Sequence, residues 1–425
     1  MTTAPLLRQA ATFSTANPHA LATILEASQT KNIIASRDIF DISGIKLWAR
    51  DQPVSAALQR KLLDRQLRNP LESCLLAEDG VTAYSLVQAA EAVLERPTAL
   101  TALVRPHAAR IVKEVAHLPL HPVPQLLLTA CQASRPALFD HAVQAMVLCG
   151  AMMDAEAGST AELRMAMLAG LLHDLGEMYI DPRYGEADAD RELDILSYQQ
   201  LVVHPHVGHL LIAQLTNYPA ALPRAIAEHH ERLDGSGYPH GLQRDGISPL
   251  GRMLAVAEGT LGVLRATERP HLARASVSLR VVPGEFDLNW VRAIEAAARA
   301  QPLRSASLSL PAVQSRLGRL DTALQVAQAS ADALAPKAES PGFKGAVLLA
   351  QHLLARLRLG WNASGLWSPD AVAAHDAAEV EAIEGELIFR LRAIERAARL
   401  RAGELAPGES ARLDELCSVL KAIGD

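Results

Sequence analysis

Apolar residues recur at helical spacing along most of this chain, and the last third shows the pattern most clearly. The spacing predicts helices over Leu310–Leu334, Phe343–Leu359 and Ala371–Arg401, which prolines and a glycine separate. Arg and Glu alternate between Glu384 and Arg401, a pattern typical of a solvated helix face with i,i+4 ion pairs rather than of a nucleic-acid surface. We therefore expect a helical C-terminal region.

One stretch near the N-terminus departs from the helical pattern. Between about residues 32 and 55, β-branched and apolar residues flank a turn at Ser43-Gly44, and helical spacing resumes over Ala56–Leu67. This predicts a short hairpin followed by a helix, and it is the only convincing strand signal in the sequence. The acidic pair and Lys of a receiver domain are not evident. We expect a packing or dimerisation unit, whose input signal the sequence does not specify.

The whole pattern predicts a mainly α protein of three units. Residues 1–118 are expected to form a small α+β module of hairpin and helices, residues 119–300 a helical bundle, and residues 301–425 a helical extension. The length agrees, because 425 residues exceed one usual domain. Hydrophobic residues make up 49% of the chain and aromatic residues only 4%, so cores rich in Ala and Leu favour helices.

Charge and apolar run lengths narrow the possible partners. A net charge of -6 leaves no basic stripe to neutralise phosphates, which argues against a nucleic-acid polymer and favours a small ligand. No apolar run approaches the roughly 20 residues of a membrane span, and the N-terminus lacks a leader pattern, so we expect a cytoplasmic protein. The scattered cysteines predict neither disulfides nor zinc ligands. A homodimer is compatible with the sequence, which does not decide the oligomeric state.

Histidines and acidic residues gather in the middle third of the chain. His229-His230 ends an apolar helix just before a turn rich in Gly, Asp and Pro, and His173-Asp174 ends another that Gly176 can cap. Burying an Asp costs several kcal/mol unless a cation or hydrogen bonds satisfy it. His141 begins a further helix, and His204-Pro205 suits a helix start with the histidine at the N-cap.

In their order and approximate spacing these residues resemble the HD-GYP family, a branch of the HD-domain metal-dependent phosphohydrolases. The resemblance spans about residues 119–300 and includes four further segments, namely Asp234-Gly235-Ser236-Gly237-Tyr238-Pro239, Gly241-Leu242, the helix Pro249–Ala257 and Gly284-Glu285-Phe286-Asp287. It implies a helical HD-domain bundle that hydrolyses cyclic di-GMP, a bacterial second messenger, to the linear dinucleotide. It also implies contacts with diguanylate cyclases or other signalling proteins through the Gly-Tyr-Pro turn.

The resemblance assigns roles to individual residues. His173 and Asp174 are the expected catalytic residues. The expected metal ligands are His141, His173, Asp174, His204, His229, His230 and Glu258. The substrate is expected beside Asp234, Gly235, Gly237, Tyr238, Pro239 and Glu177.

Nitrogen and oxygen donors without thiolates suit two divalent ions, iron or manganese, better than a thiolate zinc site. Two such ions would share Asp174 and a water, whose lowered pKa supplies hydroxide for attack on phosphorus. Family members with a third ion carry a Glu one helical turn before the first His, where this chain has Ala137. We therefore expect two ions.

Besides Ala137, two positions and one segment depart from the family's pattern. Glu177 replaces a Lys whose ammonium contacts the substrate phosphate. A charge pair at about 4 Å is worth roughly 4 kcal/mol at an effective dielectric of about 20, so reversing this charge should weaken substrate binding. Glu258 replaces an Asp ligand, and its longer arm can shift a metal by about 1 Å, which costs on the order of 100-fold in rate. Residues 261–264 replace the usual Asp-Ala-Leu. A compensating cation has three candidate sources, Arg252, Arg265 and Arg269.

Three functions stay open on this basis. One is an active or slow cyclic di-GMP phosphodiesterase, and another is a degenerate module that binds a nucleotide or a protein partner without turnover. Hydrolysis of another phosphoester is a third, because Glu177 weakens the argument for a doubly anionic substrate. His206 and His209 lie off the helix face of His204 and are expected to be solvated or outside the ligand shell, and His240 to lie on a loop surface.

Overall fold

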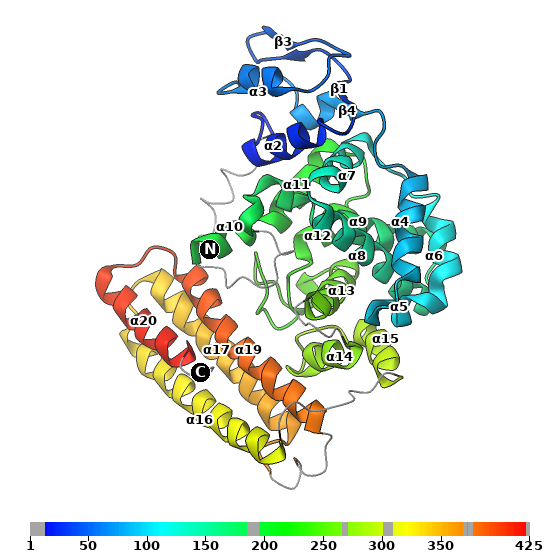
Figure 1. Cartoon of the computed structure of the whole chain (residues 1–425). Helices are drawn as coiled ribbons and strands as arrows, with labels where there is room; N and C mark the ends of the chain where they lie inside the picture. The colour runs from blue at the N-terminus through cyan, green and yellow to red at the C-terminus, as the bar shows by residue number, and fades with distance from the viewer. Residues whose placement is uncertain are drawn as a thin grey trace.

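The computed structural model describes residues 13–184, 195–265, 271–300, 309–368, 372 and 377–421. Helices dominate, and two small two-stranded sheets lie near the N-terminus. Figure 1 shows an N-terminal module that carries the strands, a central group of helices, and a C-terminal bundle of long helices. The predicted mainly α fold with a small N-terminal α+β module is confirmed.

The N-terminal module contains short elements, namely α2 (Pro18–Ala27), β1 (Ile33–Ala35), β2 (Ile39–Phe40), β3 (Lys46–Trp48), α3 (Ala56–Leu62), the 3-10 helix η1 (Leu71–Cys74) and β4 (Leu75–Ala77). The predicted hairpin is confirmed, because β2 and β3 pair antiparallel and Gly44 in their turn has φ +86°. β1 pairs antiparallel with β4 in a second sheet that the sequence does not predict. Strands of three residues are too short to show an alternating pattern.

The central region consists of helices of moderate length. They are α4 (Ala83–Glu95), α5 (Ala99–Val104), α6 (Ala108–Val115), α7 (Pro122–Ser134), α8 (Pro136–Ala155), α9 (Thr160–Leu172), α10 (Ile195–Leu201), α11 (His204–Leu215), α12 (Ala221–Glu228), α13 (Pro249–Arg265), α14 (Leu272–Arg280) and α15 (Leu288–Arg299). Short 3-10 helices connect some of them, namely η2 (Arg105–His107), η3 (Leu175–Tyr179), η4 (Pro182–Tyr184) and η5 (Arg244–Gly246). Helix α8 is the central one and packs along α9. The two backbones approach closely because Gly170 has no side chain: a Cβ there would lie 2.5 Å from the Ala145 carbonyl oxygen.

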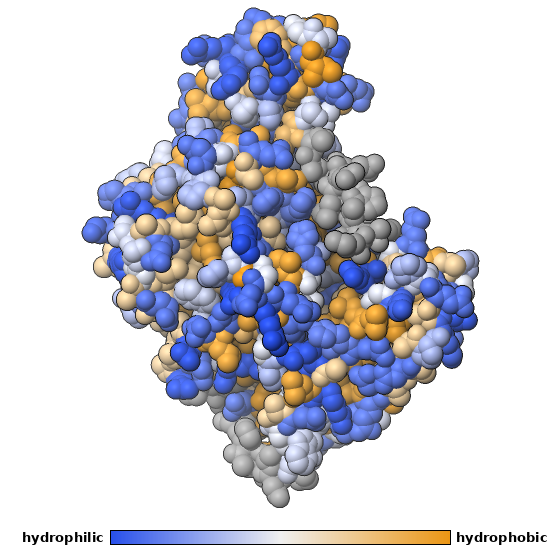
Figure 2. All heavy atoms as spheres, turned by 180° about the vertical axis from the view of Figure 1, so that it is seen from behind, coloured by the Kyte–Doolittle hydropathy of each residue, from blue (hydrophilic) through white to orange (hydrophobic). Residues whose placement is uncertain are grey.

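Helix α8 is also the one helix in the described part of the chain that is long and apolar enough to cross a membrane. It has 20 residues and a mean hydropathy of 1.2, but 72% of this window is buried inside the protein. No such run is expected from the sequence, and the burial of α8 is that of a core helix in a bundle. On the face shown in Figure 2, hydrophilic side chains predominate and apolar ones are scattered among them.

The C-terminal region forms a bundle of α16 (Leu310–Leu334), α17 (Pro341–Ser364), α19 (Ala377–Ala402) and α20 (Pro407–Lys421), with the 3-10 helix η6 (Ala335–Lys337). The three predicted helices are confirmed, and α16 has the predicted bounds. The predicted start of the third helix, residues 371 and 373–376, lies outside the described residues. Helix α20 is not predicted.

Buried apolar side chains form two cores in the described residues. One runs from Phe13 to Ala298 and joins the N-terminal module to the central helices, and the other runs from Val282 to Leu420 inside the C-terminal bundle. The first core crosses the predicted boundary at residue 118 without a break, because α4 and α6 pack against α8. The division into three units stays a prediction.

Candidate metal centre

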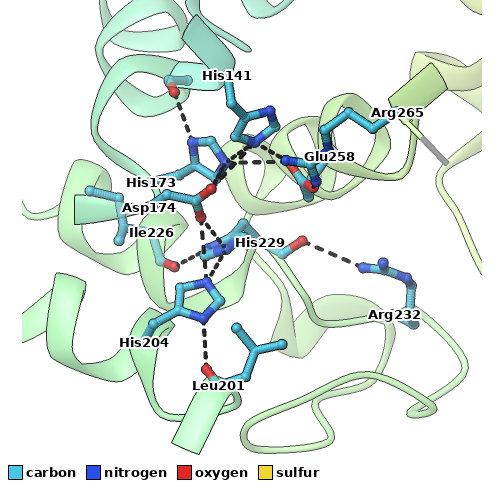
Figure 3. A network of polar contacts seen from close by, with 11 residues as sticks. His141, His173, Asp174, Leu201, His204, Ile226, His229, Arg232, Glu258 and Arg265 are labelled. Atoms are coloured by element: carbon cyan, nitrogen blue, oxygen red, sulfur yellow. Dashed lines mark hydrogen bonds and ion pairs between the residues drawn. The ribbon is translucent and has the colours of Figure 1, made fainter. Parts of the chain in front are cut away.

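Side chains from the ends and inner faces of five helices converge inside the central region (Figure 3). All seven are buried, with exposed fractions of 0% to 5%. They are the residues that the sequence analysis expected to bind metal, namely His141 on α8, His173 and Asp174 at the end of α9, His204 on α11, His229 and His230 at the end of α12, and Glu258 on α13. The structure thus brings these seven together.

The first group of donors consists of His141, His173, Asp174 and Glu258. His141 Nε2 lies 2.9 Å from Glu258 Oε2 and 3.3 Å from Asp174 Oδ2. His173 Nε2 lies 3.1 Å from Asp174 Oδ2 and 3.3 Å from Glu258 Oε2. One donor atom from each residue lies within 4.8 Å of the others, so a single ion could contact all four.

The second group consists of Asp174, His204, His229 and His230. The Nε2 atoms of His204 and His229 are 3.0 Å apart, and each lies 3.4 Å from Asp174 Oδ1. Asp174 therefore belongs to both groups and turns a different oxygen toward each. This is the arrangement of a carboxylate that bridges two ions.

Backbone carbonyls fix the orientation of three of these imidazoles. His173 Nδ1 donates to Gly170 O at 2.8 Å, His204 Nδ1 to Leu201 O at 2.7 Å, and His229 Nδ1 to Ile226 O at 2.7 Å. Each carbonyl lies three residues before its histidine, near a helix end where carbonyls lack intrahelical partners. Because Nδ1 carries the proton, the lone pair of Nε2 faces the centre, as in metal-binding histidines.

The charges in the centre fit a metal ion. Burial raises the pKa of Asp174, but His173 and the other imidazoles outweigh it and hold the pKa well below its usual value. Neither oxygen of this carboxylate has a hydrogen-bond donor with good geometry among the described residues. Burial and the neighbouring His230 lower the pKa of His229 to about 3, which keeps its imidazole neutral. A buried carboxylate among imidazole nitrogens offers the oxygen and nitrogen donors that a divalent cation binds.

The turn 234–239, which we call the GYP turn, lies beside His230. The ring of Tyr238 stacks on His230 at 4.5 Å between centroids with an interplanar angle of 16°. Glu231 holds the following residues, because its carboxylate accepts hydrogen bonds from His240 N at 2.7 Å and Leu242 N at 2.8 Å. Gly237 passes close to the chain, where a Cβ would lie 2.3 Å from His230 O. Residues 234–239 are half-buried.

Glu177 and the candidate arginines lie in different surroundings. Glu177 is only 1% exposed, its carbonyl accepts a hydrogen bond from Arg135 at 2.9 Å, and it does not line the cavity beside the GYP turn. Arg265 Nη2 lies 2.9 Å from Glu258 Oε1, at the edge of the first donor group. Arg252 pairs with two acidic residues outside the centre, Asp245 and Asp287. Arg269 lies outside the described residues.

Three local predictions were wrong. His141 does not begin a helix but lies within α8, which starts at Pro136. Gly176 does not cap α9 but lies within η3, where a Cβ would come within 2.0 Å of His204 O, so it allows η3 to pack against α11. His204 is the first residue of α11 rather than its N-cap, which is Val203. The ring of His206 contacts those of His209 and His240, and none of the three belongs to either donor group in the described residues.

The structure also brings residues to the GYP turn that the sequence analysis missed. His352 on α17 donates to the Asp234 carbonyl at 2.7 Å, and Arg356 Nε lies 3.5 Å from Asp234 Oδ2. Arg390 on α19 pairs with Glu285. These residues lie more than a hundred positions from their partners, and no local pattern in the sequence indicates the contacts.

Comparison with known proteins identifies the central region. Residues 126–281 match the model of the HD domain family. The chain is 33% identical over 156 residues to a cyclic di-GMP phosphodiesterase of Pseudomonas aeruginosa, covering 36% of each chain. It is 28% identical over 237 residues to the 3'3'-cGAMP-specific phosphodiesterase 3 of Vibrio cholerae, covering 53% of this chain and 50% of that one.

A third relative, a cyclic di-GMP phosphodiesterase response regulator of Xanthomonas campestris, is 34% identical over 105 residues, covering 24% of this chain and 26% of its own. The chain thus matches half or less of the length of each of these relatives. No solved structure matches it. The match of residues 126–281 to the HD domain family, together with the His-Asp centre and the GYP turn, thus supports the resemblance of the central region to the HD-GYP family.

Proposed function

We propose that this protein is a cytoplasmic, metal-dependent phosphodiesterase that hydrolyses a cyclic dinucleotide, with cyclic di-GMP as the first candidate. The observation that carries the proposal is the position of Asp174. Its two buried oxygens face two separate groups of donors, which suits two divalent ions, iron or manganese. When bound, such ions supply an acidified water and polarise the phosphoryl group.

The residues of the chain have distinct tasks in this proposal. Asp174 would supply one oxygen to each ion position, and His173 would hold the first ion together with His141 and Glu258. Burial of all seven donors excludes bulk water, which strengthens electrostatic interactions at the scissile phosphate. The GYP turn places Tyr238 against His230, so a substrate held by the turn would lie next to the second donor group.

The degenerate alternative finds no support in the donor set. A module that has lost catalysis would be expected to lack ligands, whereas all seven expected donors converge here. The replacement of Asp by Glu at position 258 is tolerated sterically, because Glu258 Oε2 reaches His141 and His173. The relatives differ in the cyclic dinucleotide that their names give, so 3'3'-cGAMP is the natural competitor as substrate.

The experiment is metal analysis and turnover on protein purified without oxygen and supplied with Fe²⁺ or Mn²⁺. Cyclic di-GMP, 3'3'-cGAMP and a generic phosphodiester would be compared, with Asp174→Asn as the inactive control. We expect hydrolysis of a cyclic dinucleotide that this variant loses. A fully metal-loaded protein that hydrolyses none of these compounds would instead favour a binding module. Contacts of the GYP turn with a diguanylate cyclase remain a prediction, for which Tyr238→Ala is the variant to test.

A further inference from the structure

A cavity of about 170 Å³ lies between the GYP turn and the C-terminal bundle. His230 and Tyr238 line it on the side of the metal centre, and Arg356 of α17 and Arg390 of α19 line it on the other. The cavity is smaller than the roughly 300–1,000 Å³ of sites that enclose a drug-sized ligand. It therefore suits one part of a dinucleotide rather than the whole molecule.

The walls of this cavity suit a flat ring. Tyr238 offers an aromatic ring held in place by stacking on His230. Leu353, Leu357 and Ile394 from the bundle provide apolar contact, and all three are buried. Nucleobases bind to proteins through such aromatic and apolar surfaces.

Charge in the cavity favours a neutral group over a phosphate. Arg356 faces Asp234, with 3.5 Å between Nε and Oδ2, and Arg232 faces Glu285, with 3.6 Å between Nε and Oε1. Arg390 pairs both with Glu285 and with Glu386 of its own helix, the latter at 2.7 Å. Each of these guanidinium groups thus already forms an ion pair with a carboxylate, and the carboxylates would repel a phosphate.

Glu285 and Arg390 together match the edge of a guanine. Glu285 is 2% exposed and uses Oε1 for its arginine partners, while Oε2 accepts no hydrogen bond within the described residues. Guanine offers N–H donors to a carboxylate and the acceptors O6 and N7 to a guanidinium, whereas adenine presents an N6 donor in place of O6. An acceptor beside a guanidinium donor therefore suits guanine, whose O6 can face Arg390, better than adenine, which has no acceptor at that position.

We infer that this cavity is a base-binding subsite for one guanine of a cyclic dinucleotide, with Glu285 and Arg390 at its edge, and that the C-terminal bundle completes the substrate site. The inference rests on the proposed function for the identity of the substrate. It assigns a role to helices α17 and α19, which lie outside the HD domain at residues 126–281.

The test is equilibrium binding of cyclic di-GMP and cyclic di-AMP to the full-length metal-loaded protein. Glu285→Gln exchanges one carboxylate oxygen for an amide and should reduce the preference for cyclic di-GMP at least tenfold, or about 1.4 kcal/mol. Arg356→Gln should weaken cyclic di-GMP binding several-fold with the metal content unchanged. Arg358→Gln is the matched control, because Arg358 lies on the same helix but pairs with Asp321 and does not line the cavity.

The outcomes separate the inference from the proposed function. Guanine-selective binding that both variants weaken, without turnover by the parent protein, would overturn the proposed function and support the subsite. Turnover by the parent with unchanged binding in folded Glu285→Gln and Arg356→Gln would overturn the subsite alone. If Glu285→Gln does not fold, the comparison of Arg356→Gln with Arg358→Gln decides, since equal binding by these two overturns the inference. Absence of binding to any cyclic dinucleotide overturns both.

Discussion

The carboxylate of Asp174 shows how burial constrains chemistry at one residue. It is 2% exposed and surrounded by imidazole nitrogens at 3.1 to 3.4 Å. An isolated buried carboxylate is costly, and removal of one partner from a buried ion pair typically costs about 3–5 kcal/mol. A divalent cation between carboxylate and imidazoles stabilises all of them at once, so metal binding and folding are expected to be coupled.

Replacing Asp174 by Asn should therefore remove the metal from both positions, because the variant keeps the shape but loses the shared charge. In the parent protein, chelation should lower the melting temperature, since binding at a ligand concentration of about 100 Kd contributes about 2.7 kcal/mol. The variant should melt at the same temperature with and without chelator. Asp140→Asn is the control, because Asp140 lies beside His141 on α8 but pairs with Arg96. An unchanged metal content in Asp174→Asn would rule out a shared ligand.

Metal affinity should rise with pH. Burial lowers the pKa of His173, but Asp174 outweighs it and raises the pKa well above 6.5, and Glu258 similarly raises the pKa of His141. In the metal-free protein these imidazoles therefore keep their protons to a higher pH than usual, and a metal must displace them. Calorimetric titration in buffers of different ionisation enthalpy should show proton release on metal binding. Equal affinity at pH about 6 and about 8, without proton release, would contradict this.

Glu177→Lys should destabilise the protein rather than attract substrate. The sequence alone predicts tighter binding of phosphate, but Glu177 is buried near Arg135, whose pKa it raises against the lowering effect of burial. A Lys would place a second cation there, at a cost of about 3–5 kcal/mol in the free energy of unfolding. Glu177→Gln should cost less. Denaturant unfolding measures both, and a Lys variant of parental stability with tenfold tighter cyclic di-GMP binding would restore the original placement beside the substrate.

At the level of elements, the helices that carry the metal donors follow from the sequence better than the contacts between them. In the sequence, the apolar helical pattern ends at His173 and at His229. In the structure, each of these imidazoles donates a hydrogen bond to the backbone carbonyl three residues earlier. Three of the four C-terminal helices in the described residues, α16, α17 and α19, were predicted from the same apolar pattern. The β1–β4 sheet was not, because its two strands have three residues each and lie about forty residues apart. The role of Gly176 was predicted wrongly because both a helix cap and a close contact between backbones favour glycine, and the sequence does not distinguish the two.

A buried pair links the N-terminal module to the element that follows the His-Asp pair. Tyr179 on η3 donates a hydrogen bond of 2.8 Å to Glu72 on η1, and burial raises the pKa of Glu72 above 4.5, more than the hydrogen bonds lower it. A raised carboxyl pKa means that the folded state holds the proton more tightly than the unfolded state. Stability from this group is then present at low pH and falls as pH rises from about 4.5 to the raised pKa.

Glu72→Gln should accordingly flatten the decline in stability over that pH range, because the amide mimics the protonated acid. Tyr179→Phe should cost about 1–3 kcal/mol at neutral pH, since it leaves the buried carboxylate without its donor. Urea unfolding at several pH values measures both effects. A parallel pH dependence in the parent and in Glu72→Gln would show that Glu72 does not titrate in the folded protein.

At the scale of the whole molecule, the described residues form two apolar cores, and the C-terminal bundle contacts the GYP turn of the central region. The composition and the motifs predicted the helical class and the domain at the centre. They could not show that α17 and α19 meet the GYP turn, because His352 and Asp234 are 118 positions apart and neither carries a local signal. For the same reason the cavity beside Tyr238 could not be predicted.

A chain truncated after residue 300 should fold and keep its metal, because the core from Phe13 to Ala298 and all seven donors lie within it. The fragment 119–300 should not fold stably, since it loses α4 and α6, which cover α8. Each buried Leu or Ile side chain stabilises the folded state by about 1.5–3 kcal/mol. Loss of a few of them, such as Leu86 and Ile111, therefore approaches the whole free energy of unfolding of a domain, which is about 5–15 kcal/mol. Circular dichroism and metal analysis test this.

The truncated chain should bind cyclic di-GMP more weakly than the full chain, because Asp234 loses His352 and Arg356 and the cavity loses a wall. A fragment 119–300 that melts cooperatively with a full complement of metal would instead show that the central helices are an independent domain, and that the core shared with the N-terminal module adds stability without being required. Failure of the chain truncated after residue 300 to fold would place the C-terminal bundle in the same folding unit, through the contact of α14 with α19.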